Sequence, residues 1–298
     1  MRCGTVAVVG RANAGKSTLI NVMVGEKVAI VSPKPQTTRD RILGVLTTSD
    51  YQIVFEDTPG FYKSKTELNR KMQRAARRTI NDVDLVLFVL DGHEGVKDED
   101  IDLLKSVIDQ GVKTVVAFSK IDIMPKENIP EGLVKIAEVE GIEDIIPISS
   151  RKNRNIKELL NIILSHLPEG EPIFNENVVS DKSEKFMISE IMREKILLEF
   201  DKEIPHGIAI VINEFYKKQS GTYEINLDII CEKQNHKSIL IGKQGAAIKR
   251  VNSYARESME KFLGAKVFLT TYVKVKENWR DKDNLLQEYG YGDLGEKL

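Results

Sequence analysis

Residues 10–17 read GRANAGKS and match the complete pattern G-x-x-x-x-G-K-[ST], which strongly restricts what this chain can fold into. The apolar residues 6–9 precede the pattern, so we predict a strand, a tight loop and a helix in that order. In such a loop the glycines let backbone N–H groups surround phosphate oxygens, and the following helix directs its positive end at them. Lys16 would reach the β- and γ-phosphates, and Ser17 would ligate Mg²⁺. The pattern therefore predicts a phosphate-binding site.

Short apolar runs alternate with charged segments of helical periodicity through the first half of the chain. Continuous apolar strands that alternate with helices are typical of a parallel sheet covered on both faces. Residues 41–47 and 51–55, joined by a short polar stretch, predict a hairpin that adds an antiparallel edge strand. We therefore predict an α/β domain with a mostly parallel sheet. Its buried strands are expected at residues 6–9, 85–90, 114–118 and 145–148.

Further polar motifs stand at the ends of predicted strands: residues 57–60 (DTPG), 119–122 (SKID) and 149–151 (SSR). Ligands of open α/β sheets bind outside the carboxyl ends of the strands, so these motifs converge on the crevice that holds the phosphate loop. Asp122 can accept two hydrogen bonds from guanine that adenine does not offer, which favours GTP over ATP. The expected nucleotide-binding residues are Gly10, Asn13, Ala14, Gly15, Lys16, Ser17, Thr18, Asp57, Gly60, Ser119, Lys120, Asp122, Ser149, Ser150 and Arg151.

The order and placement of these motifs resemble those of the translation-factor-related GTPases, with residues 35–39 (PQTTR) in the place of their second motif. The resemblance implies GTP and GDP as ligands together with Mg²⁺. Two positions depart from that family. Ser119 replaces an asparagine that steadies the base and the phosphate loop, and Ser150 replaces an alanine, so weaker guanine affinity is expected. The residues that the resemblance assigns to the metal are Ser17, Thr38 and Asp57.

Hydrolysis needs a group that orients the attacking water, and Phe61 stands where Ras-like GTPases carry a glutamine. A phenyl ring cannot do this, so another group, a bound cation or a partner is required. Arg39 and Arg41 stay open as candidates, and unassisted turnover is expected on the order of 10⁻⁴ to 10⁻² s⁻¹. In related GTPases without the glutamine, an asparagine in the place of Asn13 helps to hold K⁺, which is therefore a second candidate cation. The candidate catalytic residues are Asn13, Lys16, Thr38 and Gly60.

A stretch that contains proline and glycine, residues 167–172 (LPEGEP), indicates a domain boundary. We predict a first domain over residues 1–167, a linker over 168–183 and a second domain with a C-terminal tail over 184–298. The second domain is expected to follow the order α-β-β-α-α-β. Its expected elements are a helix at 184–200, strands at 208–216 and 223–231, two helices around the corner at 242–245, and a strand at 266–276.

Residues 242–245 (GKQG), with apolar residues before them and a helix after, resemble the loop of a KH domain of type II, an α+β fold that begins α-β-β. In KH domains the G-x-x-G loop clamps about four backbone nucleotides of single-stranded nucleic acid. Residues 233–256 contain six Lys or Arg and no Asp or Glu, although the whole chain has a formal net charge of −1. This local charge favours RNA binding over a plain helix-turn-helix corner. The expected RNA contacts are Ile241, Gly242, Lys243, Gln244, Gly245, Lys249 and Arg250.

Composition agrees with a folded protein of ordinary type. Of 298 residues, 41% are hydrophobic and 30% charged, which is too apolar for intrinsic disorder. Cys3 and Cys231 lie far apart, which argues against a disulfide scaffold or a zinc ribbon and fits a reducing compartment. The apolar runs are much shorter than the roughly 20 residues that span a bilayer. Positions expected in the core include Met192, Leu198, Phe200, Phe262, Phe268 and Trp279, the last packed on a C-terminal helix.

A GTPase half, a short linker and a KH-like half together resemble the bacterial Era GTPases over essentially the full length. Residues 35–39 (PQTTR), 193–195 (REK) and 272–276 (YVKVK) add to the resemblance. It implies a GTP-hydrolysing assembly factor for the small ribosomal subunit, which binds 16S rRNA near its 3′ end through the KH domain under control of the nucleotide state. It also implies a cytoplasmic monomer, and peripheral association with the inner membrane is attributed to the family.

Two other interpretations stay open from the residues alone. In the first, the chain is an RNA-binding module in which the nucleotide is a passive latch and hydrolysis is incidental. In the second, the C-terminal domain docks a protein instead of RNA. RNA affinity measured in the GTP and GDP states, and again with Lys243 and Lys249 neutralised, separates these interpretations.

Overall fold

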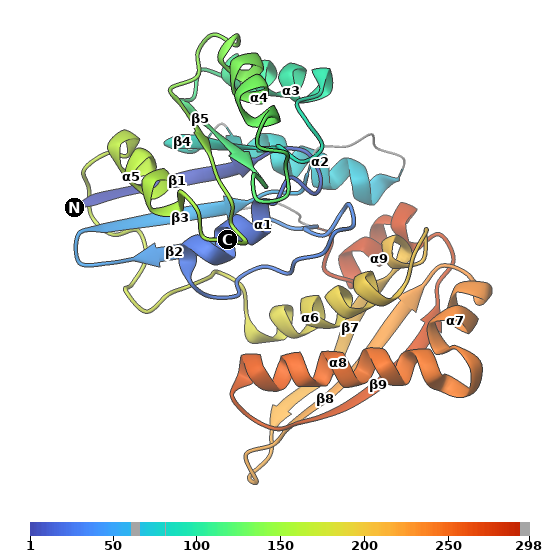
Figure 1. Ribbon diagram of the computed structural model, residues 1–298. Coiled ribbons are helices and arrows are strands. Elements are labelled where there is room, and N and C mark those ends of the chain that lie inside the picture. Colours follow the sequence, from blue (N-terminus) through green and yellow to red (C-terminus); the bar gives the residue numbers. More distant parts are fainter. Residues whose placement is uncertain (61–65, 81, 293–298) are drawn as a thin grey trace.

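The computed structural model describes residues 1–60, 66–80 and 82–292, and this part of the chain forms two sheets with helices packed on them (Figure 1). The first sheet consists of β1 (Arg2–Val9), β2 (Ile42–Thr47), β3 (Tyr51–Asp57), β4 (Leu85–Asp91), β5 (Thr114–Ser119) and β6 (Asp144–Pro147). Its order is β2-β3-β1-β4-β5-β6. β2 pairs antiparallel with β3, and the other neighbouring strands pair in parallel. The predicted mostly parallel sheet with an antiparallel edge hairpin is therefore confirmed.

The alternation of side chains along β1 separates two helical layers. Val6 and Val8 pack with the helices α1 (Lys16–Val24) and α5 (Ile156–His166), and Ala7 and Val9 pack with the other helices of this half. Because both faces are covered, the central strands are apolar throughout. The helices of this half are α1 (Lys16–Val24), α2 (Glu67–Ile80), α3 (Asp98–Ile108), α4 (Asn128–Ala137) and α5 (Ile156–His166).

The segment expected to be a linker, residues 168–183, runs along the first sheet. The carbonyl oxygen of Val179 accepts a hydrogen bond from the backbone N–H of Val45 on β2 at 2.8 Å. Phe174 and Val178 pack on the small apolar cluster that β2 and β3 present at this edge. An uncovered edge strand has unpaired backbone groups, and this segment pairs with part of that edge.

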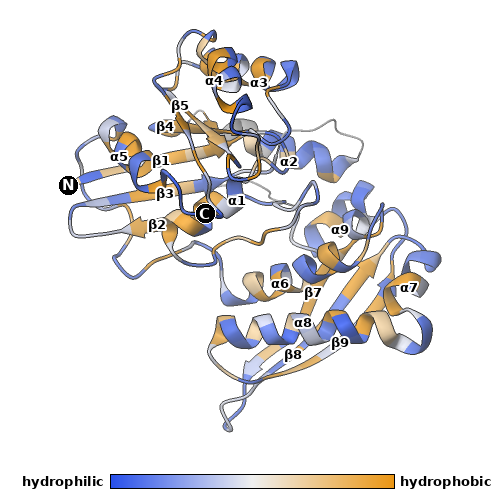
Figure 2. Ribbon diagram, in the orientation of Figure 1, coloured by the Kyte–Doolittle hydropathy of each residue, from blue (hydrophilic) through white to orange (hydrophobic). Residues whose placement is uncertain are grey.

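The second half follows the expected order α-β-β-α-α-β. Its elements are α6 (Glu184–Glu199), β7 (Ala209–Lys217), β8 (Tyr223–Cys231), α7 (Gln234–Ile241), α8 (Ala246–Leu263) and β9 (Val267–Val275). β8 lies in the middle, antiparallel to β7 and parallel to β9. Alternate residues of each strand pack under α6 and α8, and Figure 2 shows hydrophobic colour concentrated on the strands and on parts of these helices.

The chain after β9 returns to the interface between the two halves. Trp279, in the 3₁₀ turn η3 (Trp279–Asp281), is fully buried, as expected. It contacts Tyr289 just beyond α9 (Asp283–Glu288), and it packs with Leu68 and Met72 of α2. Residues of the C-terminal segment thus share one apolar cluster with the first half.

Three core expectations were wrong. Leu198 of α6 is 52% exposed because it lines an open pocket beside the first half and does not point into the core of the second half. Phe268 is 57% exposed because it alternates with Val267 and points to the sheet face opposite α6 and α8. Phe262, at 37%, lies at the rim of α8, where Met259 takes the inward position.

Among the described residues, no helix combines the length and apolar character needed to cross a membrane.

Candidate functional site

The phosphate loop joins β1 to α1 and passes close to its neighbours. A Cβ on Gly10 would lie 2.2 Å from the carbonyl oxygen of Val89 on β4, so only glycine fits there. Gly60 approaches the same loop from the end of β3, and a Cβ there would lie 2.7 Å from the Cα of Ala12. The sequence places glycine where backbone must meet backbone, which is the condition for a loop that encloses phosphate.

Lys16 lies in this loop with its ammonium group buried. Its Nζ donates to the carbonyl oxygens of Gly10 at 3.0 Å and Arg11 at 2.9 Å. Burial lowers the pKa of Lys16 to about 8, and the nearby carboxylate of Asp57 opposes this effect only in part. The ammonium group is thus held inside the loop, beside the place where phosphate oxygens would lie.

Ser17, Thr38 and Asp57 converge as the sequence predicts. Asp57 Oδ2 accepts hydrogen bonds from Ser17 Oγ at 2.7 Å and Thr38 Oγ1 at 3.1 Å. Its other oxygen, Oδ1, is buried and has no hydrogen-bond partner among the described residues. Burial also raises the pKa of Asp57. Two hydroxyls and a carboxylate with an unsatisfied oxygen form the oxygen-only donor set that suits Mg²⁺.

The base-recognition motifs support one another. Asp122 Oδ1 accepts a hydrogen bond from Ser149 Oγ at 2.7 Å, which fixes the orientation of a carboxylate that lines the pocket. Ser149 itself is buried and steadies Asp122 from outside the pocket. Lys120 Nζ pairs with Asp91 Oδ2 at 2.5 Å. This ion pair holds the lysine side chain at the wall of the pocket.

Ser119 stands where the family has an asparagine, and its hydroxyl still contacts the phosphate loop. The hydroxyl lies 2.6 Å from the carbonyl oxygen of Ala14 and 3.0 Å from that of Leu90. The shorter side chain reaches the loop because β5 brings its Cα close to it. The contact between this motif and the phosphate loop is therefore kept, although a hydroxyl offers fewer groups to the base.

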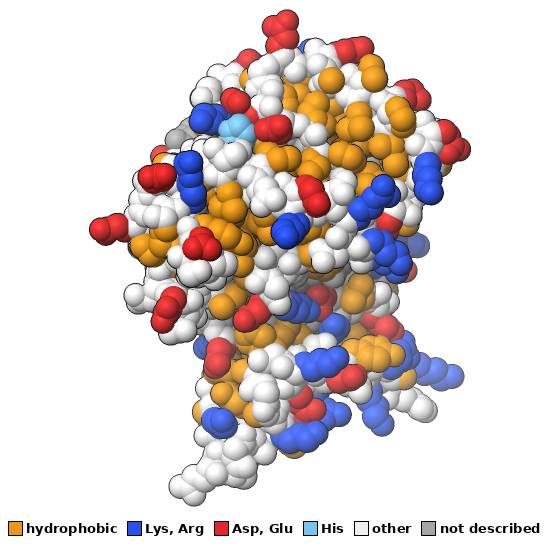
Figure 3. Space-filling view, turned by 60° about the vertical axis from the view of Figure 1, so that its left-hand side comes forward, with side chains coloured by type: hydrophobic (Ala, Val, Ile, Leu, Met, Phe, Trp, Pro, Cys, Tyr) orange, Lys and Arg blue, Asp and Glu red, His pale blue; other side chains and the backbone are white. Residues whose placement is uncertain are grey.

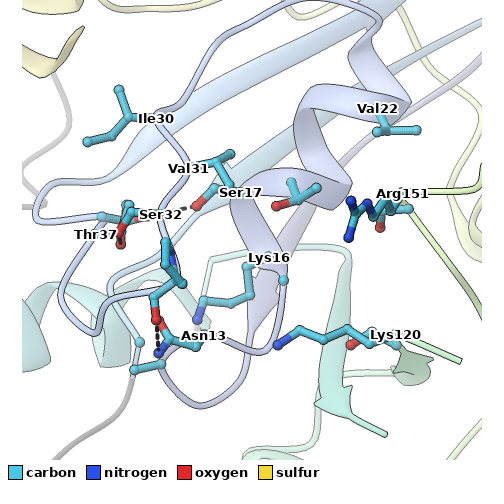
Figure 4. Close-up of a pocket in the computed structure, with 18 of the residues that line it drawn as sticks. Asn13, Lys16, Ser17, Val22, Ile30, Val31, Ser32, Thr37, Lys120 and Arg151 are labelled. Atoms are coloured by element: carbon cyan, nitrogen blue, oxygen red, sulfur yellow. Dashed lines mark hydrogen bonds between the residues drawn. The ribbon is translucent and has the colours of Figure 1, made fainter. Parts of the chain in front are cut away.

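These residues surround one pocket of about 790 Å³. Figure 4 shows Asn13 and Thr37 on one side of it and Arg151 on the other. Most of the predicted nucleotide-binding residues line this pocket, whereas Gly10, Ala14, Asp57 and Ser149 lie behind its wall. Apolar residues that the sequence motifs did not identify also line it: Val22, Ile30, Val31 and, from the second half, Leu198.

The candidates for the hydrolytic group are placed differently from what the motifs alone indicate. Asn13 has a φ of 66° and its Nδ2 donates to the carbonyl oxygen of Pro33 at 2.7 Å, which ties the phosphate loop to residues 33–39. Arg39 is only 2% exposed and points into the second half, and Arg41 pairs with Glu56 at 3.2 Å. Neither guanidinium lines the pocket. The prediction for Phe61 lies outside the described residues.

The G-x-x-G corner is built from two different glycines. A Cβ on Gly242, where α7 ends, would lie 2.7 Å from the Cβ of Ala247, so packing requires glycine there. Gly245 has a φ of +77° and nothing within 4 Å of where its Cβ would be. The second glycine therefore leaves open space at the start of α8, where another backbone can approach.

The basic residues at this corner are exposed but unequal. Lys243, Gln244 and Lys249 are exposed, whereas Arg250 is bound by Glu199 of α6 at 2.6 Å. Figure 3 shows Lys and Arg side chains over the lower part of the molecule, with acidic side chains interspersed among them. In the sequence, residues 233–256 around the corner carry six Lys or Arg and no Asp or Glu.

The first half is a P-loop nucleotide-binding domain of the GTPase class, and the second half is a KH domain. Residues 5–120 match the family described as 50S ribosome-binding GTPase, and residues 203–280 match the KH domain family. GTPase Era of Clostridium kluyveri is 44% identical over 291 residues, which cover 98% of this chain and 99% of that protein. GTPase Era of Clostridium botulinum is 42% identical over 293 residues, with the same coverage. The chain belongs to the Era GTPase family.

Solved structures agree along nearly the whole chain. A single-residue variant of Era from Aquifex aeolicus, bound to GDP·AlF₄⁻, superposes with a TM-score of 0.93 at 36% identity. A structure of Era with MgGDPNP and nucleotides 1506–1542 of 16S ribosomal RNA gives 0.93 at 37% identity. Each comparison covers 98% of this chain and 99% of the other. The predicted fold class and GTPase activity are therefore confirmed.

Proposed function

We propose that this GTPase is an assembly factor for the small ribosomal subunit, which binds 16S rRNA near its 3′ end through its KH domain under control of the nucleotide state. One observation carries the proposal: Leu198 of α6 in the KH half lines the nucleotide pocket, and Glu194 and Arg193 of the same helix bond to residues 27, 31 and 37 beside it. The relative bound to an rRNA fragment supports the choice of RNA. The units that act together are the proposed domains 1–167 and 184–298, with residues 168–183 between them.

In this proposal the first half binds GTP and GDP. Lys16, Gly60 and the backbone of the phosphate loop contact the β- and γ-phosphates, while Asp122, Lys120 and Ser150 bind the guanine. Arg151 and Thr18 line the same pocket from the base end and from α1. Ser17, Thr38 and Asp57 hold Mg²⁺, and the buried unpartnered Oδ1 of Asp57 supports this choice. When bound, Mg²⁺ neutralises charge on the phosphates.

We propose K⁺ as a second cation, held with the help of Asn13. The amide nitrogen of Asn13 is used on Pro33, so its oxygen is the atom available to a cation. Neither Arg39 nor Arg41 lines the pocket, which favours a cation over an arginine finger from this chain. Hydrolysis should be faster in KCl than in NaCl at equal ionic strength, and Asn13→Ala should remove the difference. Equal rates of the parent protein in the two salts would contradict the role of K⁺.

For the second half we propose that single-stranded RNA passes over the corner from Ile241 to Gly245, with Lys249 contacting phosphate. The exposed lysines and the open space at Gly245 support RNA more than a protein partner, because the site offers positive charge and access to its backbone. We also propose a cytoplasmic monomer. The family resemblance supports peripheral association with the inner membrane as part of this proposal.

RNA affinity measured with GDP and with a non-hydrolysable GTP analogue tests the proposal. A difference of at least several-fold is expected if the nucleotide state controls RNA binding. Equal affinities would favour the passive latch. RNA binding that survives Lys243→Ala with Lys249→Ala would mean that the RNA does not contact this corner, and the corner would then be better explained as a protein-docking site.

A further inference from the structure

Arg193 of α6 holds the backbone just before Thr38. Its guanidinium donates to the carbonyl oxygens of Thr37 and Gln36, the latter at 3.4 Å, and it also pairs with Glu190 on the same helix. Arg193 is 1% exposed. A charge so deeply buried depends on the partners it has, and removing them leaves an uncompensated charge. Two of these partners exist only when residues 36–37 lie against the KH half.

Arg39 holds the backbone just after Thr38. Its guanidinium donates to the carbonyl oxygens of Ile208 at 2.6 Å and His206 at 2.9 Å, both in the second half. The acceptors described for it are neutral oxygens, which include the hydroxyl of Tyr291 at 3.3 Å. Arg39 thus extends from the first half into a cluster of oxygens that the second half provides.

Thr38 is fixed between these two anchors. Its hydroxyl lies 3.1 Å from Asp57 Oδ2 and 2.9 Å from Ser17 Oγ, at the proposed metal site. In P-loop GTPases the segment that carries this threonine is ordered by the γ-phosphate and metal and is released after hydrolysis. Groups that bind the ordered form shift the equilibrium toward it.

We infer that Arg193 and the carbonyl oxygens of residues 206 and 208 position Thr38 for hydrolysis, so that the KH half supplies part of the hydrolytic arrangement. The inference rests on the proposed role of Thr38 and does not require RNA. Arg193 acts through Thr38 and is a positioning residue. Binding equilibria are linked. If GTP favours the form in which residues 36–39 are docked on the KH half, then this docking increases the affinity for GTP relative to GDP by the same factor.

The chain contains a natural reporter of this docking. Trp279 is the only tryptophan, and its ring stacks on Tyr291 with centroids 5.7 Å apart. The guanidinium of Arg39 lies 5.7 Å from the centre of the same Tyr291 ring. Movement of Arg39 out of this cluster therefore changes the surroundings of Tyr291, which is in direct contact with Trp279. Tryptophan fluorescence should differ between the GDP state and a non-hydrolysable GTP state.

The test is Arg193→Lys in the full chain. Lysine keeps a charge beside Glu190 but lacks the planar set of donors that reaches both carbonyl groups. We expect kcat for GTP to fall about tenfold, because displacement of Thr38 lowers the rate of the chemical step more than it lowers nucleotide affinity. GDP affinity should stay within about twofold, more Mg²⁺ should be needed for half-maximal rate, and the Trp279 response should shrink.

Arg280→Lys is the control, because Arg280 is a partly buried arginine of the KH half that pairs with Glu232 there and not with residues 36–37. It should keep the parent kcat even if it lowers the melting temperature. Thr38→Ala tests the underlying role: if it hydrolyses GTP normally, the proposed role of Thr38 fails, whatever Arg193 does.

Two results would overturn the inference itself while Thr38→Ala is inactive. One is a folded Arg193→Lys with the parent kcat. The other is an equal loss of GTP and GDP affinity, which would indicate a purely structural role. If Arg193→Lys does not fold, Arg39→Lys tests the same clamp from the other side, and a parent kcat there is equally decisive against it.

Discussion

The nucleotide pocket and the G-x-x-G corner both present backbone to phosphate, but they are built in opposite ways. In the pocket the charged groups of the phosphate and metal site are buried and already positioned by the chain, as with Lys16 on two carbonyl oxygens and one oxygen of Asp57 on two hydroxyls. At the corner Lys243 and Lys249 are exposed, and the space beside Gly245 is open. The pocket therefore works by pre-organised geometry, and the corner works by access and charge.

This difference predicts different responses to change. A pre-organised, water-excluding site loses most of its function when one member is removed, and added salt changes it little. An open basic site loses affinity in steps, and its affinity falls steeply with salt because each phosphate contact releases counterions.

Lys16→Ala should have the largest effect. Without the ammonium group the loop cannot stabilise charge on the β- and γ-phosphates, and hydrolysis should fall by about a thousandfold or more. RNA affinity of the nucleotide-free protein should change by less than about twofold, because the corner lies in another domain. Single-turnover hydrolysis and RNA titration measure the two effects. Substantial residual hydrolysis would mean that the pocket is less pre-organised than its contacts indicate.

Asp122→Asn should alter the choice of base. Ser149 fixes the orientation of the Asp122 carboxylate at the pocket wall, and replacing the carboxylate by an amide should favour xanthine over guanine nucleotides. We expect GTP affinity to fall about a hundredfold, the value of a charge-assisted bidentate contact. Competition with GTP, XTP and ATP measures the selectivity. ATP that competes equally with GTP on the parent protein would overturn guanine recognition.

Gly245→Asp should separate the two sites. A carboxylate at this corner blocks close approach of a backbone and repels phosphate, so RNA affinity should fall about thirtyfold or more while GTP hydrolysis stays unchanged. Gly221→Asp is the matched control, because Gly221 also has a positive φ, +84°, and nothing within 4 Å of an added Cβ. It lies in the turn between β7 and β8, away from the corner. Equal losses in both variants would indicate backbone strain instead of a lost RNA contact.

The sequence predicted the parts of this molecule whose chemistry is local. The phosphate loop, the order of the motifs and the G-x-x-G corner depend on residue types at fixed spacing, which can be read directly. The role of Ser119 could not be predicted, because a hydroxyl replaces an amide only if the strand brings it within reach of Ala14. The contacts of Arg193 and Leu198 with the first half could not be predicted for another reason. The residues that they meet lie more than 150 positions away, and helical periodicity does not indicate which element a helix face contacts.

The smallest effect concerns two adjacent basic residues of α8, which the sequence treats alike. Lys249 is exposed, and Lys249→Ala should weaken RNA binding roughly threefold and reduce the salt slope by about one, the loss of one phosphate contact. Arg250 is already paired with Glu199, so the double variant Glu199→Gln/Arg250→Ala removes a pair without changing net charge.

We expect that double variant to keep the parent affinity and slope. Glu199→Gln alone should free Arg250 and steepen the slope, because a guanidinium released from its carboxylate can contact phosphate instead. Titrations at three or more salt concentrations, with melting temperatures as a folding control, measure these changes. A double variant that loses as much affinity as Lys249→Ala would show that Arg250 leaves Glu199 when RNA binds. The corner would then be assembled by its ligand, and its contrast with the pre-organised pocket would be sharper still.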